Sequence, residues 1–103
     1  MTTNALDAWA LLGDPSRRTI LEALVAAPRS VAELARSLPI SRPAVSQHLK
    51  LLKDAGVVAD RAEGTRRIYS VDAAALARYR AELDGFWGAT LANLAQITPT
   101  EPT

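Results

Sequence analysis

Apolar residues recur at intervals of three or four along much of the chain, which is the spacing that brings side chains to one face of a helix. A first helix is predicted over residues 5–12, with Gly13 as its stop. Asp14 followed by Pro15 indicates the N-cap and first position of a second helix, whose apolar side ends near residues 27–28. The first quarter of the chain is therefore predicted to form two short helices.

A third and a fourth helix follow with almost no connection between them. Ser30 and Glu33 have the spacing of a capping box, and the apolar positions after the cap recur at i, i+3, i+4 and i+7: Val31, Leu34, Ala35 and Leu38. Only residues 39–40 separate this helix from Ser41, which can cap a helix that ends at Gly56. Two helices joined by so tight a turn indicate a helix-turn-helix.

The fourth helix has one apolar stripe and one polar face. At 100° per residue, Val45, Leu49 and Leu52 fall on one side, with His48 at the edge of that stripe. The opposite side carries Pro43, Ser46, Gln47 and Lys50, with Arg42 and Lys53 flanking it. Short polar groups read base edges and long cations hold phosphates, so this face is predicted to enter a DNA groove. We expect Arg42 to bind a guanine and Gln47 an adenine or a phosphate. We expect His48 to be packed and hydrogen-bonded at the core edge, rather than to contact a base or sense pH.

After Gly56 the pattern changes to the alternation of strands. Residues 57–61 and 65–71 are predicted to form a hairpin around a turn at 62–64, where Gly64 supplies a positive φ. Arg66 and Arg67 follow this turn, and a cationic hairpin beside a recognition helix commonly contacts phosphate or the minor groove. The alternative is an exposed, solubilising hairpin. The predicted fold is mainly α with a small β-hairpin, a winged helix-turn-helix.

Asp72 can cap a last helix over residues 73–95. Its apolar stripe comprises Leu76, Tyr79, Leu83, Phe86, Trp87, Leu91 and Leu94. This stripe is wider than the small core requires, so we expect a homodimer through the first and last helices, with Leu6 and Trp9 completing the two-fold interface. The alternative is that Phe86 and Trp87 close the core of a single subunit. One domain is predicted over residues 5–95, with a disordered segment at 1–4 and a flexible tail at 96–103.

The net charge of +1 conceals an uneven distribution. Residues 29–67 hold eight cations against four acids, a balance of +4, whereas the segments before and after are mildly acidic. A basic centre of this kind is typical of a polyanion-binding surface. With no cysteine in the chain, disulfide scaffolds, zinc fingers and thiol switches are excluded. Neither a signal peptide nor a membrane-spanning run is recognisable, so a cytoplasmic protein is expected.

Enzymatic chemistry finds no support in the sequence. Ser46 and His48 lie two positions apart, about 200° around a helix, and so cannot form a nucleophile–base pair. There is also no glycine-rich phosphate loop and no evident carboxylate pair.

The order of these elements and several motifs make the chain similar to the ArsR/SmtB family of bacterial winged-helix repressors. The motifs that carry the likeness lie at residues 11–21, 31–35, 41–53, 55–58 and 63–69. The resemblance implies a homodimeric repressor whose recognition helices enter successive major grooves of a palindromic operator. It also implies that Arg42, Pro43, Ser46 and Gln47 approach the bases, while Ser30 and Val31 lie near the DNA backbone.

The chain departs from the metal sensors of that family, which use cysteine pairs on the third helix or Asp/His clusters on the last. Residues 31–35 and 73–95 contain neither Cys nor His, and Glu82 and Asp84 alone would hold a hard cation only weakly. We therefore expect no metal and no cofactor in an autoregulating repressor.

Two alternatives remain open at the level of sequence. The first is that the basic face docks an acidic protein partner instead of DNA. The second concerns a cluster of Trp9, Phe86 and Trp87, which either accepts a small apolar effector or simply packs at the interface.

Overall fold

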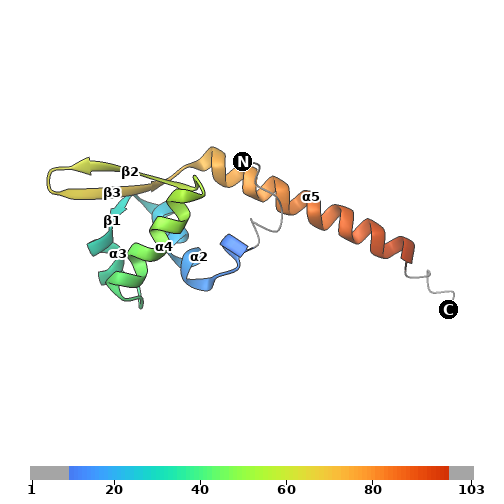
Figure 1. Cartoon of the computed structure of the whole chain (residues 1–103), viewed down its shortest axis with the longest axis horizontal. Coiled ribbons are helices and arrows are strands. Elements are labelled where there is room, and N and C mark those ends of the chain that lie inside the picture. Colours follow the sequence, from blue (N-terminus) through green and yellow to red (C-terminus); the bar gives the residue numbers. More distant parts are fainter. Residues whose placement is uncertain (1–9, 98–103) are drawn as a thin grey trace.

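The computed structural model describes residues 10–97 and shows five helical segments around a small sheet (Figure 1). Residues 10–12 are helical, and the rest of the predicted first helix, including Leu6 and Trp9, lies outside the described residues. The remaining elements are α2 (Pro15–Ala26), β1 (Arg29–Ser30), α3 (Val31–Ser37), α4 (Arg42–Asp54), β2 (Val58–Glu63), β3 (Arg66–Val71) and α5 (Ala73–Ile97). This order confirms the predicted winged helix-turn-helix.

Three predicted caps begin the three short helices. Asp14 accepts hydrogen bonds from the backbone N–H groups of Ser16 and Arg17 at the start of α2. Ser30 and Glu33 form the capping box of α3, and Ser41 accepts from the N–H of Ala44 in α4. Because each cap satisfies donors that a helix leaves unpaired, these contacts fix where α2, α3 and α4 begin.

The core lies between α2, α3, α4 and the sheet. Its fully buried side chains include Ile20, Leu34, Leu49, Leu52 and Val57. Because α3 and α4 both bury their apolar stripes here, the polar face of α4 is left on the outside.

The sheet has three antiparallel strands in the order β1-β3-β2. The hairpin pairs Glu63 with Arg66, so the turn is the two residues Gly64 and Thr65, and Gly64 has φ +65°. The predicted turn at 62–64 was therefore wrong by one to two positions, since residues 62 and 63 pair in the ladder. The strand β1 was not predicted, because two residues carry no alternation; its Ser30 pairs with Ile68 of β3 and ties the start of α3 to the wing.

The first half of α5 packs on the core, and the second half extends away from it, giving the molecule a length of 65 Å (Figure 1). Leu76 and Leu83 pack against the core, and Tyr79 is buried at 7 % exposure. The Tyr79 side chain thus belongs to the core of its own chain, and its predicted place in a subunit interface stays a prediction. None of the described helices is long and apolar enough to cross a membrane.

Candidate nucleic-acid interface

The outer face of α4 is polar and open. Ser41, Arg42, Pro43, Ser46, Gln47, Lys50 and Lys53 are all exposed. On the opposite side of the helix, Val45, Leu49 and Leu52 are fully buried. The predicted division of this helix into an inner and an outer face is confirmed, and a protruding helix of this kind can enter a DNA major groove.

A hollow of about 210 Å³ lies beside this face and joins three parts of the chain. It is lined by Ser30, Val31, Ala32, Arg42, Thr65, Arg66 and Arg67. The start of α3, the start of α4 and the wing therefore bring five of the predicted DNA-binding residues to one place. Ser30 contributes little accessible surface, because its hydroxyl accepts from the N–H of Glu33 and its own N–H donates to Glu33 Oε1.

Most cations of the basic segment are paired with a carboxylate. Lys50 Nζ lies 3.0 Å from Asp54, Arg61 lies 3.2 Å from Glu63, and Arg66 lies 3.9 Å from Glu33 and 3.7 Å from Glu63. Arg42, by contrast, has no ion pair among residues 10–97. Exposed pairs of this kind contribute little energy, so these cations can exchange a carboxylate for a phosphate at small cost.

Asp60 of β2 forms two short ion pairs and is less exposed than the acids of the other pairs. Its carboxylate lies 2.9 Å from Lys53 Nζ of α4 and 3.0 Å from Arg67 Nη1 of β3, and its side chain is only 7 % exposed. The hydrogen bond from Lys53 lowers the pKa of Asp60, and Arg67 lowers it further, whereas burial opposes both. The carboxylate is therefore held in its charged form between α4 and the hairpin of β2 and β3.

Glu33 is also held ionised, by the capping box. The hydrogen bond donated by the Ser30 backbone N–H is the main cause that lowers the pKa of Glu33. Its negative charge consequently remains 3.9 Å from Arg66, which lines the hollow.

Comparison with known proteins agrees with this geometry. The family described as bacterial regulatory protein, arsR family, matches residues 14–60, from the cap of α2 to the middle of β2. The HTH-type transcriptional regulator Rv2034 of Mycobacterium tuberculosis is 53 % identical over 94 residues, which cover 91 % of this chain and 88 % of that protein. The chain belongs to the ArsR family.

Solved structures place this ArsR-family chain among winged-helix regulators. The crystal structure of a possible transcriptional regulator for arsenical resistance has a TM-score of 0.75 and 36 % identity, covering 91 % of this chain and 98 % of that one. The solution structure of the homodimeric winged helix-turn-helix DNA-binding domain of Mb0332 from Mycobacterium bovis has a TM-score of 0.63 and 28 % identity, covering 79 % and 75 %. The ArsR-family protein is a DNA-binding transcriptional regulator with a winged helix-turn-helix fold.

The environment of His48 in this ArsR-family protein matches the predicted burial but not the predicted hydrogen bond. The ring is half-buried as expected, but its Nδ1 is buried without a hydrogen-bond partner among the described residues. The expected hydrogen bond was therefore wrong at Nδ1 in the described part of the chain.

The exposed part of α5 carries the remaining predicted interface residues. Trp87, Leu91 and Leu94 are 42 %, 58 % and 53 % exposed, and the Phe86 and Trp87 rings meet edge to face with centroids 5.4 Å apart. Trp87 does not close the core of the single subunit, contrary to the alternative considered above. This part of α5 presents an apolar surface that the described residues leave uncovered.

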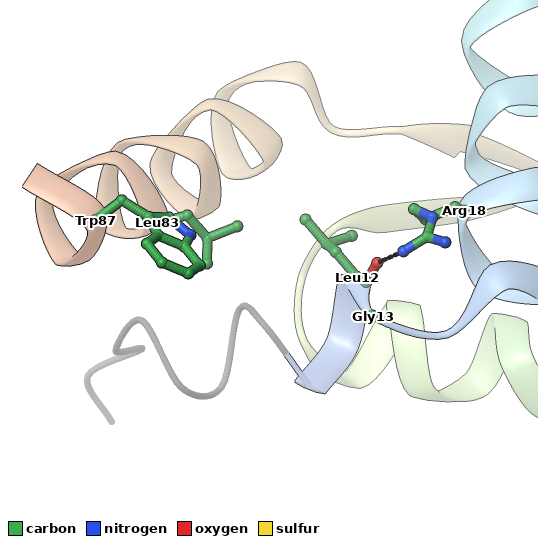
Figure 2. A pocket seen from close by; sticks show the side chains of 5 residues that line it. All are labelled: Leu12, Gly13, Arg18, Leu83 and Trp87. Carbon is green, nitrogen blue, oxygen red and sulfur yellow. Dashed lines mark hydrogen bonds between the residues drawn. The ribbon is translucent and has the colours of Figure 1, made fainter. Parts of the chain in front are cut away.

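A pocket of about 180 Å³ lies between this surface and the body of the subunit (Figure 2). Figure 2 shows Leu83 and Trp87 of α5 on one side and Leu12 and Gly13 on the other, with Arg18 Nη1 donating to the Leu12 carbonyl at 2.9 Å. The small apolar effector remains a prediction, as does the cluster with Trp9, which lies outside the described residues. Among residues 10–97, no three His, Asp or Glu side chains gather into a metal-binding group.

The sequence reasoning did not find Asp60. Its role depends on strand register, since Asp60 pairs with Tyr69 and Arg67 is the diagonal neighbour on the same face of the hairpin. Had the turn been predicted at Gly64 and Thr65, the register would have indicated that Asp60 and Arg67 lie close together.

Proposed function

We propose that this ArsR-family regulator is a sequence-specific repressor that binds a palindromic operator as a homodimer and represses its own gene without sensing a metal. The observation that carries the proposal is the hollow lined by Ser30, Val31, Arg42, Arg66 and Arg67 beside the open face of α4. It gathers hydrogen-bonding and cationic groups from three segments at one surface. Such a surface matches a groove edge together with its phosphates.

In the proposed complex α4 lies in the major groove. Ser46 and Gln47, both exposed in the second turn of the helix, would reach base edges, and the exposed Pro43 would approach the bases from the first turn. Arg42 is the cation at the start of α4 and pairs with no carboxylate in the described part of the chain, so its guanidinium is the best candidate for bidentate binding of a guanine.

The backbone contacts come from the surrounding cations. Lys50 and Lys53 extend from α4, and Arg66 and Arg67 extend from the wing, all with exposed side chains. In this role they set the position and orientation of α4, while Ser30 and Val31 approach the phosphates from the edge of the hollow.

A second subunit is proposed to cover the apolar surface of α5. Trp87, Leu91 and Leu94 form one stripe, and the related domain of Mb0332 is a homodimer. A two-fold dimer presents two copies of α4, so the operator it reads has two-fold symmetry. Metal-independence is supported by the residue types available, because the chain has no cysteine and a single histidine, which lies on α4.

The experiment is a gel shift with the DNA upstream of the protein's own gene, repeated with scrambled competitor. The proposal expects a specificity ratio of about 10³ or more. Zn²⁺, Cd²⁺ or arsenite should leave the affinity unchanged, and a reporter behind the same DNA should be silenced by the protein. Equal competition by scrambled DNA would instead favour the docking of an acidic protein on the basic face.

A further inference from the structure

Asp60 joins the recognition helix to the wing. Its carboxylate contacts Lys53 Nζ at 2.9 Å and Arg67 Nη1 at 3.0 Å, so one acid on β2 holds a cation from α4 and a cation from β3. Both cations are about half exposed, at 52 % and 58 %, whereas the carboxylate between them is 7 % exposed. The cations therefore face the solvent, and the acid lies behind them.

This arrangement differs from the other ion pairs of the basic segment. Lys50 and Asp54 are both largely exposed, at 75 % and 61 %, so water and salt screen their attraction. The Asp60 side chain is only 7 % exposed, so its attraction to Lys53 and Arg67 is screened less. Lys53 and Arg67 are consequently held near Asp60 when no DNA is present.

The chemistry of the three groups resembles that of a phosphate contact. Two cations share one monoanion, as two cations of a protein share one backbone phosphate, and the group keeps a net charge of +1. Lys53 retains further N–H donors on its ammonium, and Arg67 retains further donors on its guanidinium, so both can still reach DNA. The carboxylate halves the positive charge that they offer.

We propose that Asp60 tempers the attraction of the protein for DNA of any sequence by standing in for a phosphate between Lys53 and Arg67. The inference rests on the proposed DNA-binding face. Nonspecific binding comes almost entirely from phosphate contacts, whereas operator binding also draws on base contacts. A carboxylate that weakens phosphate contacts therefore removes a larger fraction of the nonspecific binding free energy, while both affinities fall by similar factors.

The test is the isosteric substitution Asp60→Asn, with affinities for operator and scrambled duplexes measured between 50 and 200 mM salt. One additional unit of charge per subunit gives two per dimer, and the salt slope steepens by about 0.9 for each phosphate neutralised. The nonspecific affinity should therefore rise at low salt and lose roughly tenfold more across this salt range than the parent loses. The operator affinity should rise by a similar factor, because the same phosphate contacts form in both complexes. An unchanged slope would overturn the proposal.

The control for net charge is Asp84→Asn. Asp84 also pairs with an arginine, Arg80 at 3.6 Å, but on the long helix that runs away from the wing (Figure 1). The same change of one charge there should leave the slope at its parental value, with the dimer confirmed by size-exclusion chromatography. A slope that steepens equally in both variants would mean that total charge is responsible, and the role of Asp60 would be rejected.

Two further variants separate this inference from the proposed function and guard against misfolding. Lys53→Gln and Arg67→Gln should each make the slope shallower; if neither does, the proposed DNA-binding face is itself wrong at this point. If they do and Asp60→Asn does not steepen it, only the present inference fails. Should Asp60→Asn fail to fold, Asp60→Thr removes the same charge with a residue that favours strands, and the same steepening of about two units per dimer is expected.

Discussion

The hydroxyl of Tyr79 donates a hydrogen bond to the backbone carbonyl oxygen of Ala55 at 3.2 Å, although 24 positions separate the two residues in the chain. Ala55 is the C-cap of α4, and Tyr79 lies in the second turn of α5. The start of α5 is thus hydrogen-bonded to the C-terminal end of α4, the proposed recognition helix. We expect a partner that binds the start of α5 to influence the orientation of α4 as well.

Removal of this hydroxyl should destabilise the subunit without changing its shape. Tyr79→Phe is expected to lower the free energy of unfolding by about 1 kcal/mol, because a part-buried hydrogen bond is lost while the ring remains packed. Urea denaturation followed by circular dichroism measures the effect. Tyr69→Phe is the matched control, since the Tyr69 hydroxyl has no hydrogen bond within residues 10–97, and equal losses in both variants would contradict the assignment.

Loss of the arginine at the start of α4 should affect sequence recognition. Arg42→Ala is expected to weaken operator binding by about 1 to 3 kcal/mol and to relax the preference at one position in each half-site. Fluorescence anisotropy with a set of singly substituted operators measures both effects. Arg80→Ala removes the same charge from α5, where the side chain is 85 % exposed, and should leave the preference intact. Parental discrimination by Arg42→Ala would remove this residue from base recognition.

Charges on the apolar stripe of α5 should separate the proposed dimer. Leu91→Glu and Leu94→Glu each place a carboxylate where the exposed leucines would be buried against a partner, and desolvation of that charge is costly. Sedimentation velocity should show monomers, and operator binding should fall with them. Gln96→Glu adds the same charge about 180° around the helix from Trp87, on the side opposite the stripe, and should remain dimeric. Dimers in the leucine variants would place the interface elsewhere.

Acid should weaken the fold through Asp14. Hydrogen bonds from the backbone N–H groups of Arg17 and Ser16 lower the pKa of Asp14, so the folded chain binds a proton at lower pH than the unfolded chain does. Its contribution to stability is therefore complete at neutral pH and is lost as the pH falls below the ordinary aspartate value of about 3.9. Asp14→Asn and Asp14→Ser keep a capping group without this titration, and their unfolding free energies should fall less steeply between pH 5 and pH 3. If the unfolding free energies of the parent and the variants changed in parallel with pH, the titration of Asp14 would not be the cause.

The turn of the wing should not tolerate a β-carbon without cost. Gly64 has φ +65°, a conformation that disfavours most L-residues by roughly 1 to 2 kcal/mol. Gly64→Ala should lower the thermal midpoint, whereas Gly64→Asn should lower it less because asparagine enters this region more readily. Equal midpoints for glycine and alanine would show that the turn can adopt another conformation.

Features set by neighbouring residues could be predicted from the sequence. The caps at Asp14, Ser30 and Ser41 and the two faces of α4 follow from residue type and helical spacing, and the structure confirms them. Features that depend on distant pairing could not be predicted in this way. The strand β1 is visible only through its pairing with β3, and the placement of Tyr79 in the core depends on Ala55.

The candidate DNA-binding site also has features that neighbouring residues determine and features that depend on distant pairing. The exposed residues of α4 could be identified from the helical wheel alone, because side chains opposite a buried stripe must face outward. The contacts of Asp60 with Lys53 and Arg67 could not be predicted without knowing exactly where β2 ends. A shift of one residue would move the Asp60 side chain to the other face of the strand.

The exposed C-terminal part of α5, residues 91–96, should make the helix content depend on protein concentration. Residues 91–96 are all exposed, so these turns gain no packing energy from their own subunit, and a helical segment of this length is marginal in water by itself. Their order should depend on a second subunit, and the mean ellipticity at 222 nm should decline as the sample is diluted through the dissociation range. Secondary structure content would then report on assembly.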